Sequence, residues 1–223
     1  MLSPLVPKSR LITGERLTLA EFLRAWDAQT DIRRAELIEG VVHMPSPVTR
    51  EHGRSHATVI SWLWHYAQAT PGCECGDNTT WLMLESAPQP DAFLRIVPER
   101  GGQSRNEANY NAGAPELIVE VCLTSTEVDF GPKLALYKRA GVQEYVTIEL
   151  LTRRIVWRVL ENGSYGELAV GSDAVLRSHR FPGLWLDVDA FWIDDGERLM
   201  KTLETGLRTD GHSQFAVSLA SRP

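Results

Sequence analysis

The sequence is poor in cysteine, in long apolar runs and in excess positive charge, and each shortage excludes a class of protein. Three cysteines occur among 223 residues, and one residue separates Cys73 from Cys75. A disulfide framework is therefore not expected, which fits a reducing compartment. No segment reaches the ~18 consecutive apolar residues of a membrane span, and the first ten residues lack the apolar region of a signal peptide. We therefore expect a cytoplasmic protein that does not enter a membrane.

Motifs of several enzyme and metal-binding classes are also missing. The chain has no glycine-rich phosphate loop and no Gly-x-Ser-x-Gly nucleophile turn. Cys73 and Cys75 are too close for a zinc finger and have no second cysteine pair. His52 and His56 have a spacing that can bind zinc on a helix, but no third clear ligand accompanies them. We interpret these histidines as a partly buried structural pair.

The charge of the chain counts weakly against nucleic-acid binding, because the net charge is −6 at pH 7. A local excess of basic residues nevertheless occurs between positions 129 and 158. It comprises Lys133, Lys138, Arg139, Arg153, Arg154 and Arg158. These residues either contact phosphate groups or form an ordinary solvated surface, and the sequence leaves both interpretations open.

The expected order of helices and strands is mixed, which is typical of an α+β fold. Amphipathic periodicity and capping signals predict helices at 18–28, 50–69 and 132–140. A hairpin is expected over 35–44, with its turn at Glu39 and Gly40. Further strands are expected at 79–84, 92–97, 115–123, 144–150, 153–160, 165–170 and 174–178.

One main domain is expected, because 43% of the 223 residues are hydrophobic and can form a single core. We predict an N-terminal extension over residues 1–16 and a domain over residues 17–205. A flexible tail is predicted over residues 206–223, where the sequence is polar and lacks periodicity.

Glu120 is the most informative residue, because it interrupts an apolar run from Pro115 to Leu123 that otherwise predicts a fully buried strand. A buried charge costs several kcal/mol unless a metal ion, a cation or hydrogen bonds compensate it. Strand alternation places Glu120 on the same face as Ile118 and Cys122. Glu120 therefore requires a partner on that face.

Three residues are candidate partners of Glu120. Asp91 opens a strand, and two convergent carboxylates suit Mg²⁺ better than zinc. Alternatively, Asp91 caps a turn and Glu120 pairs with a buried arginine. Lys133 lies on the apolar side of its helix, so its ammonium either faces the carboxylates or extends to solvent. Glu36, on a strand of the hairpin, is either a further site residue or a solvent-facing strand residue.

A series of short segments gives these candidates a common context. The segments are Glu36 to Gly40, His52, Pro90-Asp91, Ile118 to Cys122, Asp129, Lys133, Tyr137, Gly141 to Tyr145 and Phe181 to Asp187. In this order they resemble the PD-(D/E)XK nuclease superfamily, and specifically its Uma-two-type restriction-endonuclease branch. The resemblance covers roughly residues 17–191.

One departure from the superfamily pattern concerns the catalytic lysine. The superfamily usually has a lysine two residues after the glutamate, where this chain has Cys122. A thiol cannot supply a fixed positive charge. In the Uma-two branch the lysine lies on the following helix, so the resemblance assigns its role to Lys133.

The resemblance implies a restriction-endonuclease-like mixed β-sheet core flanked by helices, with additional antiparallel strands on the C-terminal side. The implied function is a metal-dependent phosphodiester hydrolase, a DNA endonuclease in which carboxylate-bound Mg²⁺, or Mn²⁺, activates water. The residues implied for catalysis are Glu36, Asp91, Glu120 and Lys133, of which Asp91 and Glu120 would bind the metal. His52 and Tyr137 are candidate supporting residues. DNA is the expected substrate, and a homodimer is one expected assembly.

Two other functions stay open at this point. One is a catalytically inactive module that keeps the nuclease fold in order to bind nucleic acid or protein. The other is a structural protein in which Glu120 bonds an arginine and Lys133 extends into solvent. The presence of the acidic positions together with a lysine favours the enzyme.

Overall fold

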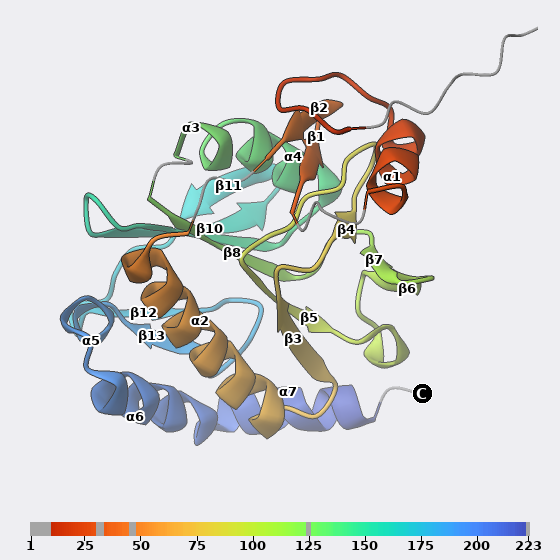
Figure 1. Cartoon of the computed structure of the whole chain (residues 1–223). Helices are drawn as coiled ribbons and strands as arrows, with labels where there is room; N and C mark the ends of the chain where they lie inside the picture. Colours follow the sequence, from red (N-terminus) through yellow and green to blue (C-terminus); the bar gives the residue numbers. More distant parts are fainter. Residues whose placement is uncertain (1–9, 30–33, 45–47, 124–125, 222–223) are drawn as a thin grey trace, which may run out of the picture.

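A six-stranded mixed sheet forms the centre of the protein (Figure 1). The computed structural model describes residues 10–29, 34–44, 48–123 and 126–221. The strands of this sheet, in spatial order, are β11 (Ser164–Glu167), β10 (Arg154–Glu161), β9 (Glu144–Glu149), β8 (Leu117–Cys122), β5 (Ala92–Ile96) and β3 (Cys73–Asp77). Strands β8 and β9 are parallel, and the other neighbouring pairs are antiparallel.

Seven α-helices and one short 3-10 helix, Pro98–Arg100, lie within the described residues. The α-helices, in chain order, are α1 (Leu19–Asp27), α2 (Arg50–Ala69), α3 (Thr126–Asp129), α4 (Pro132–Ala140), α5 (Val188–Ile193), α6 (Gly196–Leu207) and α7 (Asp210–Ala220). Parallel strands require a long crossover connection, and α3 and α4 supply it between β8 and β9. None of the helices among the described residues is both long and apolar enough to span a membrane.

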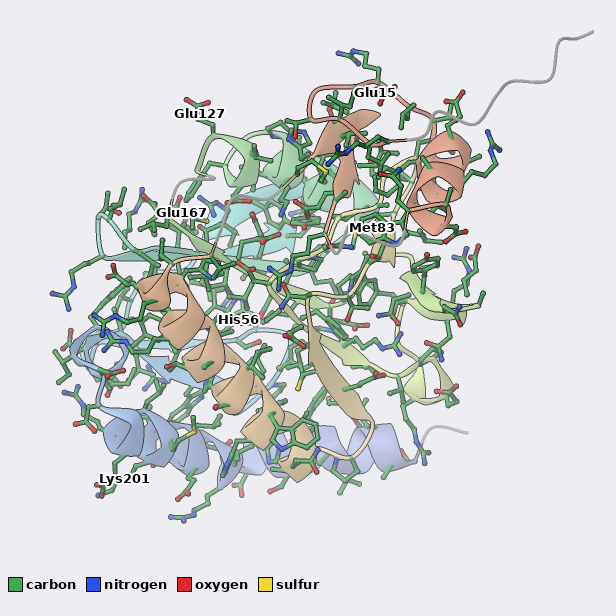
Figure 2. All side chains as sticks on the ribbon, viewed as in Figure 1. Glu15, His56, Met83, Glu127, Glu167 and Lys201 are labelled. Atoms are coloured by element: carbon green, nitrogen blue, oxygen red, sulfur yellow. The ribbon has the colours of Figure 1, made fainter. Side chains whose placement is uncertain are left out.

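Helices cover the sheet on both faces, and strand alternation divides β8 between two cores. Val119 packs with α2, α6 and α7 residues in one buried cluster. Ile118 packs with α4 residues in the other. Figure 1 shows α2, α6 and α7 on one side of the sheet and α3 and α4 on the other. Charged side chains such as Lys201 on α6 point outward (Figure 2). Glu120 lies on the same face of β8 as Ile118, and it therefore also faces α4.

Local sequence signals explain the helices that the sequence predicts. Thr18 and Glu21 form a reciprocal capping box at the start of α1. Helix α4 begins with Pro132, and it ends at Gly141, whose φ of 89° is a left-handed conformation that glycine adopts without strain. The predicted helices and the 35–44 hairpin are confirmed, with β1 at Glu36–Ile38 and β2 at Val41–His43.

The smaller sheets differ in part from the prediction. The strand predicted over 79–84 is limited to β4 (Trp81–Leu82), which joins β7 (Tyr110–Ala112) and β6 (Arg105–Glu107) in a three-stranded sheet. The C-terminal side carries antiparallel strands as expected, including the pair β12 (Val175–Arg177) and β13 (Trp185–Asp187). Strand β3, at Cys73 and Cys75, was not predicted as a strand of the main sheet.

The prediction of a flexible tail after residue 205 is wrong. Residues 210–220 form α7, which Thr209 caps and which buries His212 and Leu219. The His212 ring nitrogen lies 2.9 Å from the Thr70 hydroxyl. Tertiary contacts, rather than a strong local pattern, therefore order this segment. Of the predicted N-terminal extension, residues 1–9 lie outside the described residues, and the Gly14 N–H bonds the Val42 carbonyl of the hairpin at 2.8 Å.

Candidate active site

Glu120 is held at the centre of the sheet by hydrogen bonds to one of its oxygens. Its side chain is buried, and Oε1 accepts bonds from Lys133 Nζ and from the Tyr137 hydroxyl, both at 2.9 Å. Both donors come from α4, the helix that packs over this face of β8. The structural alternative in which Glu120 bonds an arginine and Lys133 extends into solvent is therefore wrong.

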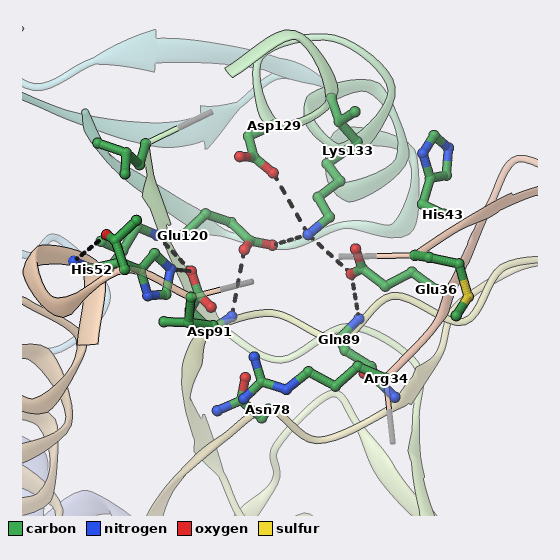
Figure 3. Close-up of a pocket in the computed structure, with 16 residues that line it drawn as sticks. Arg34, Glu36, His43, His52, Asn78, Gln89, Asp91, Glu120, Asp129 and Lys133 are labelled. Atoms are coloured by element: carbon green, nitrogen blue, oxygen red, sulfur yellow. Dashed lines mark hydrogen bonds and ion pairs between the residues drawn. The ribbon is translucent and has the colours of Figure 1, made fainter. Parts of the chain in front are cut away.

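Lys133 is a buried ammonium among three carboxyl groups (Figure 3). Its Nζ lies 2.9 Å from Glu120 Oε1, 2.9 Å from Glu36 Oε1 and 3.6 Å from Asp129 Oδ1. Lys133 of α4 therefore supplies, next to Glu120, the positive charge that Cys122 cannot provide. The Cys122 thiol is fully buried, and burial raises its pKa, so it stays neutral.

Glu36 points from β1 into the same cleft. In addition to Lys133, its Oε1 accepts a bond from the Gln89 backbone N–H at 2.7 Å. Glu39 is exposed at the hairpin turn and instead pairs with Arg139. Of the two interpretations left open for Glu36, the contacts therefore support the site residue rather than the solvent-facing one.

Asp91 lies beside Glu120 and is fixed on several sides. Its Oδ2 accepts a hydrogen bond from the Val121 N–H at 2.8 Å and lies 3.3 Å from His52 Nε2. The Asp91 carbonyl lies 2.7 Å from His56 Nε2. The two histidines of α2 therefore orient Asp91 through different atoms, which agrees with a structural pair rather than a zinc site.

The four carboxyl groups carry more negative charge than one lysine neutralises. Burial raises the pKa of Glu120 well above its usual range, and the neighbouring carboxylates of Asp129, Asp91 and Glu36 raise it further against the opposing effect of Lys133. Burial favours a lower pKa for Lys133, but the carboxylates outweigh it, and the Lys133 pKa rises well above its usual range. The lysine is therefore charged, and the cluster favours one more cation or proton at Glu120.

Hydrogen bonding with Asp91 raises the pKa of His52, against the effect of burial. For Asp91 itself burial favours a higher pKa, but the His52 and Val121 bonds and Lys133 outweigh it and lower the pKa. Asp91 is thus an ionised carboxylate, and the neighbouring Glu120 is the carboxyl that competes for a proton.

The oxygens left over on Asp91 and Glu120 fit a hard divalent cation. Among the described residues, no hydrogen bond reaches Asp91 Oδ1, and Glu120 Oε2 has one long contact of 3.4 Å with the Asp91 N–H. Mg²⁺ is commonly held by one or two carboxylates together with water and substrate phosphate. No group of three or more His, Cys, Asp or Glu side chains within the described part of the chain is arranged to hold a metal. The donor set therefore suits a two-carboxylate site completed by water and substrate, and not a closed protein cage.

An open cleft of about 450 Å³ gives access to these groups. Its lining includes all four predicted catalytic residues and His52. Tyr137 lies behind Glu120 and is buried. The structure therefore brings together Glu36 of β1, Glu120 of β8 and Lys133 of α4 with Asp91, which directly precedes β5. Helix α2 contributes His52.

The basic residues between 129 and 158 do not form one surface. Lys133 lies in the cleft, and Arg139 pairs with Glu39. The Arg158 guanidinium is buried and stacks over Phe130, with its central carbon 4.9 Å from the ring centre. Their proximity in sequence therefore does not predict a single phosphate-binding patch.

The cleft lining also includes Asp129, Gln89 and Arg34, which were not predicted as site residues. Asp129 ends α3, and its carboxyl group meets Lys133 of α4 across the non-helical Gly131, so the spacing of four within a single helix does not account for this pair. Gln89 acts through its backbone N–H, which no side-chain pattern reveals. Arg34 lines the cleft two positions before Glu36, and alternation along an extended segment places the two on one face.

A mixed sheet flanked by helices, with Glu120 on one strand and Asp91 directly before the neighbouring strand, defines an α+β protein with an acidic cleft. A crystal structure of a "putative nuclease belonging to DUF820" from Anabaena variabilis ATCC 29413 has the same fold, with a TM-score of 0.62 and 16% sequence identity over 79% of this chain and 98% of that one. No curated protein matches the chain. The sequence model of the Uma2 family, described as "Putative restriction endonuclease", matches residues 19–189, and the chain therefore belongs to this family.

Proposed function

We propose that the protein is a Mg²⁺-dependent or Mn²⁺-dependent endonuclease that hydrolyses phosphodiester bonds in DNA. The observation that carries the proposal is the buried ammonium of Lys133 between Glu120 and Glu36, with Asp91 beside it in an open cleft. Membership of a family described as restriction endonucleases agrees with this chemistry. A purely structural ion-pair network would not require unbonded carboxylate oxygens facing a cleft.

In this proposal Asp91 and Glu120 hold the ion through the oxygens that no strong hydrogen bond occupies. A divalent ion bound there would lower the pKa of a water and stabilise negative charge on the phosphate. Lys133 fixes the orientation of the Glu120 carboxylate and adds a permanent positive charge near the reacting group. Glu36 fixes Lys133 from the opposite side and offers a second acceptor for the water.

The proposal is tested by incubating purified protein with supercoiled plasmid, linear duplex and RNA in Mg²⁺ or Mn²⁺. Wild type is expected to nick or cut DNA, and Asp91→Asn and Glu120→Gln are expected to lose activity while they stay folded. Calorimetry is expected to detect Mg²⁺ binding to wild type and not to either variant. The proposal is refuted if wild type cleaves no nucleic acid and binds neither ion.

The inactive-module alternative gives a different result in the same experiment. That module would bind nucleic acid without cutting it in either metal, and Glu120→Gln would bind as wild type does. Light scattering with and without DNA tests the expected homodimer, because an enzyme that cuts both strands with one site per chain acts most simply as a pair.

A further inference from the structure

Arg34 occupies the part of the cleft that faces the carboxylates, and its role is unassigned. It lines the same cavity as Glu36, Asp91 and Glu120. In Figure 3 its side chain extends along the wall opposite Lys133, with the guanidinium toward Asn78. Alternation explains this direction, because the neighbouring residues Ala35 and Leu37 are fully buried in the N-terminal core and Arg34 faces away from it.

The Arg34 guanidinium has unused donors. Among the described residues no hydrogen bond or ion pair engages it, although it shares the cleft with four carboxyl groups. Its positive charge opposes the rise in the pKa of His52, which places it within electrostatic range of the His52 and Asp91 pair. An arginine that is near a carboxylate cluster but bonded to none of it remains available to a ligand.

The other strong cation of the cleft cannot take that role. Lys133 is 5% exposed, and its short contacts are with Glu120 and Glu36 behind the cleft surface. A nucleic-acid phosphate entering this cleft meets excess negative charge, which repels it. The opposite wall also presents two amide side chains, but Asn78 donates to Asp77 and Gln89 donates to Thr80. Among the described lining residues, Arg34 is therefore the permanently charged donor that faces the cleft with free N–H groups.

We propose that Arg34 binds the non-bridging oxygens of a backbone phosphate of the substrate and holds the strand against the carboxylates. Guanidinium matches phosphate in a planar, two-point geometry that an ammonium cannot reproduce. Such a contact is independent of base sequence. This inference rests on the proposed nuclease function, since it assigns the substrate-positioning group of that same cleft.

The test compares Arg34→Met and Arg34→Lys with Arg208→Met as a control. Arg208 is exposed at the end of α6 and pairs with Glu204, so its loss changes the net charge equally at a distance from the cleft. Fluorescence anisotropy with a labelled DNA duplex in Ca²⁺ measures Kd at several salt concentrations. Plasmid cleavage in Mg²⁺ gives kcat and KM, and thermal melting reports folding.

Arg34→Met is expected to weaken DNA binding about tenfold on any duplex sequence and to reduce the slope of log K against log salt by about 0.9, the value for one lost phosphate contact. Arg34→Lys is expected to keep the slope but recover only part of the affinity, and the control is expected to match wild type. The cleavage loss should appear mainly in KM.

An unchanged salt slope in Arg34→Met overturns the proposal, as does a lower melting temperature that accounts for the whole loss of binding. The binding measurement does not depend on cleavage. If wild type binds DNA but does not cut it, the endonuclease proposal fails while the role of Arg34 is still decided. If wild type neither binds nor cuts, both fail.

Discussion

Replacing Lys133 with methionine should destabilise the protein strongly, because it removes the cation that compensates a group of buried carboxylates. The ammonium lies within 2.9 Å of both Glu120 and Glu36 and 3.6 Å from Asp129. Removing one partner of a buried pair typically costs about 3–5 kcal/mol, since the remaining charge is left uncompensated. For a domain of this size, that loss lowers the melting temperature by roughly 6–20 °C.

The loss in Lys133→Met should depend on pH in a definite direction. The pKa of Glu120 is already raised by burial and by its neighbours, and removal of Lys133 raises it further. When the pKa of a carboxyl group is higher in the folded state than in the unfolded state, its contribution to the stability of the fold is fully present at a pH below the unfolded-state pKa. That contribution is lost as the pH rises through the folded-state pKa. The variant should therefore be closer to wild type at pH 5 than at pH 8.

Urea unfolding followed by circular dichroism in EDTA measures both effects. Lys201→Met is the matched control, because Lys201 is exposed on α6 and its substitution should change the free energy of unfolding by less than about 0.5 kcal/mol. A loss of less than about 1 kcal/mol in Lys133→Met at pH 8, or a loss that grows as pH falls, would refute the argument that Lys133 compensates buried carboxylates.

Three further predictions concern Tyr137 and Glu120 in the cleft and Leu219 in the core under α7. Tyr137→Phe removes a buried hydroxyl that donates to Glu120 and should cost about 1.5–3 kcal/mol in urea unfolding; an unchanged midpoint would contradict this. Mg²⁺ affinity measured by calorimetry should rise about tenfold per pH unit between pH 5 and the raised pKa of Glu120, because the ion displaces one proton there; a flat profile would exclude Glu120 as a ligand. Leu219→Ala in α7 should cost about 2–5 kcal/mol, whereas a loose tail would show no effect.

Local signals in the sequence account for several elements. The capping box of Thr18 and Glu21 and the Pro132 and Gly141 pair each act within a few residues of the helix that they bound, so the sequence alone predicted α1 and α4. The apolar run around Glu120 predicted β8 because its strand is buried on both faces.

Elements that depend on distant contacts escaped prediction. Strand β3, Cys73–Asp77, has few strand-forming residues and exists because it pairs with β5 along its whole length. Helix α7 is ordered by contacts such as that of His212 with Thr70 and by the buried Leu219, none of which its own sequence reveals. The intrinsic preference of β3 for a strand and of α7 for a helix is weak, and tertiary contacts outweigh it in both segments.

For the candidate site, the residue types and their positions along the chain indicated which chemical groups to expect: a carboxylate in a buried strand, an acidic residue where a strand opens, and a lysine on the apolar side of a helix. That these groups lie next to one another is a property of the tertiary structure. Pairing of β5 with β8 brings Asp91 beside Glu120, and packing of α4 over that face directs Lys133 to the same carboxylate. The β1–β2 hairpin brings Glu36 to the same lysine, and Arg34, two residues before Glu36, lines the same cleft. The amino-acid sequence specifies which residue types are present. The distances between the charged groups of the site depend on the order of the strands in the sheet and on the packing of α4, which exist only in the folded protein.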